Sequence, residues 1–136
     1  MSQKTNRYTP TETLFSNRNT LIQRAIRECD GATVILKFLV ASYPTQIQLQ
    51  QFSFAYDVLK KIDHPNIIKV LDYQEQNNLP FMVFEDNQSI DLRKYTQLQV
   101  GECLPIGDFF TIAIQLAEAL SVIPVSYTHL TLPTKA

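Results

Sequence analysis

The sequence predicts an α+β fold in which a five-stranded antiparallel sheet is combined with a helix inserted between its third and fourth strands. Short runs rich in β-branched and aromatic residues, separated by polar turns, predict the strands. One longer segment with apolar residues at helical spacing interrupts these runs and predicts the helix. The length of 136 residues and the hydrophobic content of 45% suit one globular domain with a single core.

The first three strands are expected at residues 8–15, 20–27 and 32–39, where short alternating or apolar runs are separated by polar clusters. Asp30 and Gly31 lie between the second and third runs. Both residue types tolerate a positive φ, so they predict a tight hairpin turn. The three strands should therefore be antiparallel neighbours.

A helix is expected from residue 44 to residue 62. Pro44 and Thr45 stand at its start, where both residue types favour helix initiation. Pro65 follows its end, because proline disfavours helical geometry in the residue before it and cannot donate a backbone hydrogen bond. The apolar residues near helical spacing are Ile47, Phe52, Ala55, Leu59 and Ile62. They predict one amphipathic helix.

Two more strands follow at residues 67–74 and 79–86, around a polar turn at residues 75–78. The second of them is apolar enough to be a central strand. Residues 85–97 can form a linker and a short helix. Residues 106–120 are apolar on most faces over about four turns, which predicts a largely buried helix.

The composition argues against several classes of function. With 12 basic and 13 acidic residues the net charge is −1, so no strong field attracts nucleic acid or an anionic membrane surface. Cys29 and Cys103 lack the spacing of a metal or redox motif, and no metal ligands are predicted. The chain shows no apolar signal core and no membrane-spanning run. We therefore expect a cytoplasmic protein without nucleic-acid or membrane partners.

A lysine in the third predicted strand stands inside an otherwise apolar run. A buried ammonium group is costly alone, but it becomes favourable where it can pair with phosphate oxygens in a cleft. Taken in isolation, Lys37 could equally be an edge-strand residue whose charged end reaches water. The order of the surrounding elements favours the first of these interpretations.

This order resembles the small lobe of a eukaryotic-type protein kinase. Residues 34–37, V-I-L-K, take the place of the V-A-I-K on the third strand of that family, and Ile22 stands 15 residues before Lys37, where its glycine-rich loop ends. Residues 60–73 match the connection from its αC helix to the fourth strand, and residues 81–87 match the fifth strand and hinge. The fold implied is a kinase small lobe followed by the first helices of the large lobe.

The resemblance covers residues 8–123 and divides the chain into parts. Residues 1–7 are expected to be a disordered N-terminus, residues 8–86 the small lobe, and residues 87–123 the hinge and the start of a truncated large lobe. The tail, residues 124–136, resembles a translated sequencing adapter and is expected to be non-native. The lobe looks closest to those that open large multidomain signalling proteins of the cyanobacterial type, which also carry an ATPase-like region and a sensor histidine kinase.

The resemblance also implies an ATP site. Lys37 would contact the α- and β-phosphates, and the backbone carbonyl of Glu85 and amide of Asn87 would hydrogen-bond the purine. The adenine pocket would be lined by Leu14, Ile22, Ile35 and Phe84, the last in the gatekeeper place. For the complete domain the resemblance implies ATP with magnesium, a protein serine or threonine hydroxyl as acceptor, and downstream signalling domains of the parent chain as partners.

Two departures from the family pattern lie at this site. Phe15, Asn17 and Thr20 stand where the loop would have its glycines, which let the backbone approach phosphates closely. Ala55 stands where a glutamate of the αC helix would pair with the strand lysine. Lys37 is therefore expected to lack its usual ion pair.

A third departure concerns catalysis. The chain contains neither H-R-D-x-x-x-x-N nor D-F-G, the motifs that supply the base and the metal ligands in a kinase, so no catalytic residues are predicted. We expect a truncated protein kinase domain that is inactive as it stands. Two alternatives remain open at this point: a pseudokinase-like, non-catalytic interaction module, and a small unrelated α+β binding domain.

Overall fold

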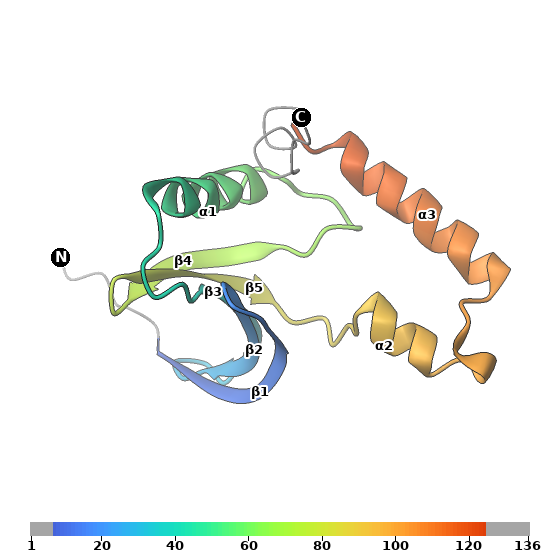
Figure 1. Cartoon of the computed structure of the whole chain (residues 1–136), viewed down its shortest axis with the longest axis horizontal. Helices are drawn as coiled ribbons and strands as arrows, with labels where there is room; N and C mark the ends of the chain where they lie inside the picture. Colours follow the sequence, from blue (N-terminus) through green and yellow to red (C-terminus); the bar gives the residue numbers. More distant parts are fainter. Residues whose placement is uncertain (1–6, 125–136) are drawn as a thin grey trace.

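A computed structural model describes residues 7–124 and contains one five-stranded antiparallel sheet in the order β1-β2-β3-β5-β4 (Figure 1). The elements are β1 (Tyr8–Ser16), β2 (Thr20–Arg27), β3 (Thr33–Leu39), α1 (Gln46–Leu59), β4 (Val70–Gln76), β5 (Leu79–Glu85), α2 (Leu92–Gln97), the 3-10 turn η1 (Val100–Glu102) and α3 (Ile106–Ser121). The predicted α+β fold is confirmed. The predicted disordered N-terminus and non-native tail fall almost wholly outside the described residues.

The two hairpin turns differ in how closely they follow the sequence-based expectation. Asn77 and Asn78, between β4 and β5, have φ values of 53° and 64°, as a two-residue type I′ turn requires. Between β2 and β3 the loop is longer than the predicted pair: Arg27 N–H donates to the Ala32 carbonyl at 2.8 Å. Only Gly31 there has a positive φ, 72°, so the chain reverses through a wider loop.

Helix α1 begins with a capping box. The Thr45 hydroxyl accepts a hydrogen bond from Gln48 N–H at 3.1 Å, and the Gln48 side chain accepts one from Thr45 N–H at 2.9 Å. The helix ends at Leu59, three residues before its predicted end, because bonds of the tighter 3-10 type close its last turn. Strand β4 likewise starts late, at Val70.

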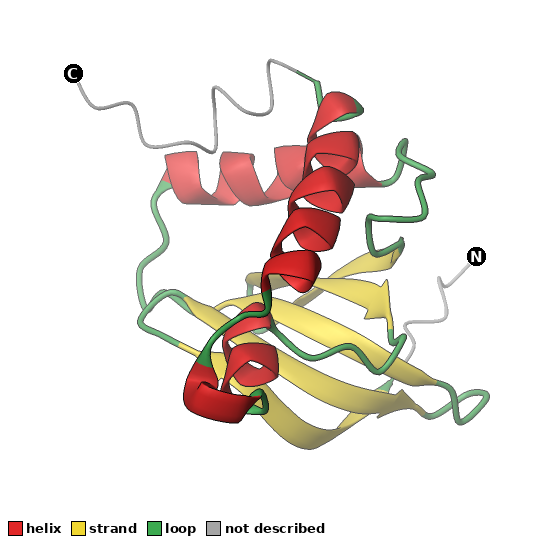
Figure 2. Ribbon diagram, turned by 90° about the vertical axis from the view of Figure 1, so that its right-hand side faces the viewer, coloured by secondary structure: helices red, strands yellow, loops and turns green. Residues whose placement is uncertain are grey.

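The two faces of the sheet have different roles. Cross-strand partners share a face, and Ile22, Lys37, Met82 and Tyr73 form one such row. Helix α1 packs on this face, where the Tyr56 ring lies 5.1 Å from the Tyr73 ring. Figure 2 shows α1 running across the sheet.

The main hydrophobic core lies on the opposite face. Its buried members are Ala25, Val34, Leu36, Phe81 and Val83. The Tyr8 ring on β1 lies 6.1 Å from the Phe81 ring on β5, although two strands separate these elements in the sheet. The sheet therefore curls strongly around this core.

The helix predicted at residues 106–120 is present as α3, but its apolar side chains are not buried in the described chain. In α3 only Ala119 is buried, and the Phe109, Phe110 and Ile114 side chains are more than half exposed. An apolar helix is buried only where another element packs against it. Within residues 7–124 nothing covers this face (Figure 1).

Polar contacts hold α3 in place. The Asn66 side-chain amide donates to the Gln115 carbonyl and to Glu118 Oε2, both at 3.0 Å. Tyr95 OH on α2 donates to Asp108 Oδ2 at 2.7 Å, and this hydrogen bond raises the pKa of Tyr95. In the described part of the chain no helix is long and apolar enough to cross a bilayer.

Candidate functional site

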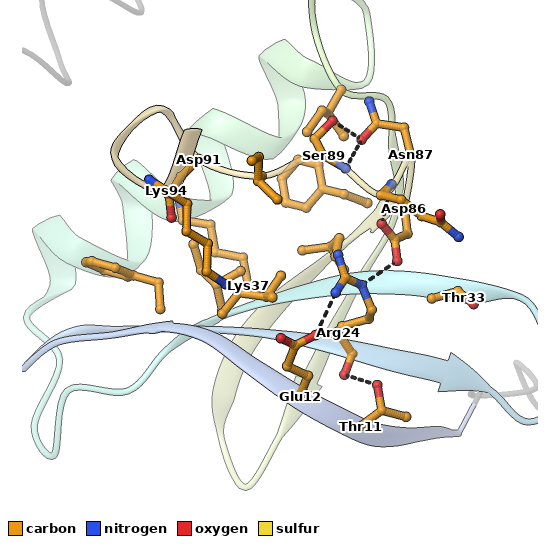
Figure 3. Close-up of a pocket in the computed structure, with 18 of the residues that line it drawn as sticks. Thr11, Glu12, Arg24, Thr33, Lys37, Asp86, Asn87, Ser89, Asp91 and Lys94 are labelled. Carbon is orange, nitrogen blue, oxygen red and sulfur yellow. Dashed lines mark hydrogen bonds and ion pairs between the residues drawn. The ribbon is translucent and has the colours of Figure 1, made fainter. Parts of the chain in front are cut away.

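A cleft of about 810 Å³ opens between the α1 side of strands β1 to β3 and the segment that follows β5 (Figure 3). Six of the seven residues predicted for the ATP site line it: Leu14, Ile22, Ile35, Lys37, Phe84 and Asn87. These residues come from β1, β2, β3, β5 and the segment after β5. The structure thus brings together side chains that are up to 73 residues apart in the chain.

The register of the sheet explains this convergence. Ile22 pairs with Lys37 across β2 and β3, and Ile35 pairs with Phe84 across β3 and β5. Because alternate residues of a strand face the same side, Ile35 and Lys37 must share the cleft face. The cleft therefore has an apolar wall and, at one end, the amines of Lys37 and Lys94, which Figure 3 labels.

Lys37 has no carboxylate partner within ion-pair distance in residues 7–124. Burial removes water from its amine and lowers the pKa below the ordinary 10.5. Ala55 supplies no charge at the place expected for a glutamate, and Asp57 pairs instead with Lys60 at 3.0 Å. The amine is therefore available to an anionic ligand.

Glu85, the seventh predicted residue, does not line the cleft. It pairs with Val34 of the core, so its side chain points to the other face, and its N–H donates to the Lys69 carbonyl at 3.0 Å. The Asn87 N–H makes no hydrogen bond to any other residue in the described range 7–124. Asn87 can thus offer a backbone donor to a ligand, which is the role predicted for it.

An ion-pair cluster at the cleft wall escaped the sequence-based prediction. Arg24 Nε lies 2.7 Å from Asp86 Oδ2, and Arg24 Nη1 lies 2.6 Å from Glu12 Oε2 (Figure 3). The Asp86 side chain is only 2% exposed, and its other oxygen accepts the Gln88 N–H at 2.8 Å. The hydrogen bond that Arg24 donates to Asp86 is the main cause that raises the pKa of Arg24. The cluster joins β1 and β2 to the segment after β5.

Comparison with known proteins decides the family. Residues 16–129 match the family model described as protein tyrosine and serine/threonine kinase. The chain belongs to the protein kinase family. The serine/threonine-protein kinase TIO of Arabidopsis thaliana is 30% identical over 99 residues, which are 73% of this chain and 7% of that relative. This kinase chain therefore spans a small part of the relative's length.

The β1–β2 turn of this kinase chain is closed by an asparagine side chain. Asn17 Oδ1 accepts the N–H of Asn19 at 3.0 Å and the N–H of Thr20 at 2.8 Å. Asn17 N–H in turn donates to the Thr20 carbonyl at 2.9 Å. The turn keeps its shape without the glycines that the family uses there.

His64 and Asp108, which could attract a catalytic role, make local hydrogen bonds instead. His64 Nδ1 accepts the Asn66 N–H at 3.1 Å, and Asp108 is held by Tyr95 as described above. Cys29 and Cys103 are exposed free thiols. Within residues 7–124 no group of three or more histidine, cysteine or acidic residues could hold a metal ion.

We expect Lys37→Met to stabilise the free chain by about 1 kcal/mol near pH 7, because the change removes a buried charge without a partner. In the wild type the pKa of Lys37 is lower in the folded state than the unfolded value of 10.5. Between these two pKa values the unfolded state binds more protons than the folded state. The free energy of unfolding therefore rises with pH across that window. Urea denaturation followed by circular dichroism at about pH 7 and about pH 10 measures both effects.

The matched control is Lys60→Met, which alters an exposed lysine at the C-terminal cap of α1 that is paired with Asp57. Its denaturation midpoint should stay near that of the wild type at both pH values. A Lys37→Met chain less stable than Lys60→Met would show that the Lys37 amine has a stabilising partner in solution.

Proposed function

We propose that this chain binds an adenine nucleotide in the cleft and forms the nucleotide-binding part of a serine/threonine kinase domain. The observation that carries the proposal is the convergence of Lys37 and five other predicted ATP-site residues on one cleft. The kinase family match and the serine/threonine kinase relative support the same class of ligand.

The chemistry of the cleft suits such a ligand. The apolar side chains of Ile22, Ile35 and Phe84 offer a dry surface for a purine ring, and the backbone N–H of Asn87 offers a donor. Lys37 can pair with a phosphate oxygen, which would compensate the burial of its amine. Each end of the cleft would thus contact a different part of the nucleotide.

In our proposal the complete domain transfers the γ-phosphate of ATP to protein serine or threonine hydroxyls. The present chain lacks the H-R-D and D-F-G motifs, so phosphoryl transfer is not expected from it alone. Residues 7–124 also lack a ligand set for magnesium, which the complete domain would have to supply. We further propose a cytoplasmic parent of the large multidomain signalling type, with which the free thiols Cys29 and Cys103 are consistent.

A non-catalytic, pseudokinase-like interaction module is the second candidate. The unpaired Lys37, the alanine at position 55 and the self-closed β1–β2 turn favour it, because each removes a feature that active kinases use. The two candidates agree on the fold and differ in whether the parent transfers phosphate. Kinase activity of the parent protein on a serine-containing peptide mixture would distinguish them.

Calorimetric titration of the 136-residue chain with ATP and with adenosine tests nucleotide binding. We expect Lys37→Ala to weaken ATP binding by roughly tenfold and to leave adenosine binding unchanged, because the lysine contacts only the phosphates. Lys60→Ala, outside the cleft, is the matched control and should bind both ligands as the wild type does. Equal ATP affinities of wild type and Lys37→Ala would remove the role proposed for the lysine.

A further inference from the structure

We infer that Asn17 is a specificity-determining residue that withholds two backbone amides of the β1–β2 turn from the phosphates, so that the cleft gains less affinity from a triphosphate than it would with those amides free. This inference rests on the proposed nucleotide binding. It concerns the two backbone amides of Asn19 and Thr20, which both donate to Asn17 Oδ1.

The position of the turn makes these amides relevant to a nucleotide. Phe15, which pairs with Ile22, and Lys37, which pairs with Ile22 on the other side, lie in one row across the sheet. The turn begins two residues beyond Phe15, on the side of this row where β3 ends, although its residues do not themselves line the cleft. A phosphate chain that extends past Lys37 beyond this row would therefore approach the turn.

The Asn17 carboxamide already takes the place that a phosphate oxygen would need. Backbone amides bind an anion when their hydrogens are free to point at it. Here the two donors are used at 3.0 and 2.8 Å, so a phosphate would exchange one hydrogen bond for another with little net gain. Phe15 adds a bulky ring to the cleft wall at the same end.

The turn does not depend on the Asn17 side chain alone. Asn17 N–H donates to the Thr20 carbonyl, and Val40 N–H, beyond the end of β3, donates to the Asn19 carbonyl, both at 2.9 Å. These bonds use backbone atoms and survive a change of side chain. Removing the carboxamide should therefore free the two amides while the turn keeps its place.

The consequence is a preference for ligand class. In the wild type, the two amides that Asn17 occupies do not help to distinguish ATP from adenosine, so that distinction is left to cations such as Lys37 and Lys94 of the cleft lining and Arg18 of the turn. Adenosine should therefore bind more weakly than ATP by about the contribution of the cationic side chains alone, with no further gain from the turn amides. With a glycine-rich turn whose amides are free, the affinity would instead rise with each added phosphate.

Titration of four chains with adenosine and with ATP tests this inference. We expect Asn17→Ala to bind ATP roughly three- to tenfold more tightly than the wild type, with adenosine affinity unchanged. Asn17→Asp keeps the acceptor and adds a negative charge, so it should gain nothing. Asn19→Ala is the matched control, since the Asn19 side chain makes no hydrogen bond in residues 7–124 while its N–H remains. An unchanged or weaker ATP affinity of Asn17→Ala would overturn the inference.

A second measurement does not depend on how the variants fold. In amide NMR spectra of the wild type, ATP should shift the Asn87 signal but leave the Asn19 and Thr20 signals in place. Large ATP-dependent shifts of those two turn amides would contradict the inference even if no variant could be purified. Should the wild type bind neither adenosine nor ATP, the proposed function itself fails and this inference with it; ATP binding without a gain in Asn17→Ala rejects the inference alone.

Discussion

Replacing Arg24 with glutamine is expected to destabilise the chain by roughly 2 to 3 kcal/mol and to weaken adenosine binding. The change leaves the Asp86 carboxylate, 2% exposed, without its cation, and breaking a buried pair from one side is costly. Asp86 also holds the Gln88 N–H, so the segment that carries the Asn87 donor should lose its fixed geometry. Urea denaturation and adenosine titration measure the two effects.

Arg27→Gln is a closely matched control on the same strand. The Arg27 and Arg24 side chains are 24% and 23% exposed, and each pairs with an aspartate. The partner of Arg27, Asp30, is 46% exposed, however, and exposed pairs contribute little. We expect a much smaller loss for Arg27→Gln and no change in adenosine affinity. Equal losses in the two variants would show that burial of Asp86 is not what matters.

The difference in stability between the wild type and the control Arg27→Gln should itself depend on pH. The hydrogen bond from Arg27 is the main cause that lowers the pKa of Asp30 from 3.8 to about 2. The contribution of this pair is therefore fully present above the unfolded value of 3.8 and is lost as pH falls towards about 2. The small difference between the wild type and Arg27→Gln should disappear over that acid range.

Local patterns carry most of the fold prediction. Alternation of side chains along β3 is enough to place Ile35 and Lys37 on one face, and the strand register bears this out. Thr45 caps α1 through hydrogen bonds with Gln48, which is only three residues along the chain. A sequence pattern can capture such a short spacing. Such features can be predicted because their causes lie within one element.

The features that sequence reasoning missed have causes spread over several elements. Arg24 and Asp86 are 62 residues apart, and neither belongs to a recognisable motif. Glu12 faces Arg24 only because the register of β1 shifts between Pro10 and Glu12, and such a shift reverses the alternation on which face assignments depend. The residue pattern of β1 contains no indication of this shift.

Two further features could not be predicted from the sequence: the exposure of α3 and the direction of the Asn17 side chain in the β1–β2 turn. The apolar residues of α3 indicate a helix that needs a partner, but they do not say whether the described chain provides one. Asn17 belongs to a residue type that tolerates a turn, whereas its use of the Asn19 and Thr20 amides depends on a rotamer. The sequence thus predicted which residues line the site. It did not predict the hydrogen bonds that occupy the turn amides beside it.

Leu36→Ala is expected to cost about 2 to 5 kcal/mol, the largest single loss of stability that we predict. Leu36 is 2% exposed in the central strand β3, on the core face next to Val83, and alanine would leave a cavity that the surrounding strands cannot close. For a domain of this size the melting temperature should fall by roughly 10 to 20 °C. Differential scanning calorimetry measures the fall.

Leu36→Met is the matched control because it nearly conserves volume, so it should lose less than about 1.5 kcal/mol. The neighbouring change Lys37→Met should have the opposite sign, a gain in stability together with a loss of ATP binding. Two adjacent residues of one strand would then act in opposite directions, since Leu36 faces the core and Lys37 faces the cleft. If both variants lost stability to a similar extent, the separation of the sheet into a structural face and a ligand-binding face would be wrong.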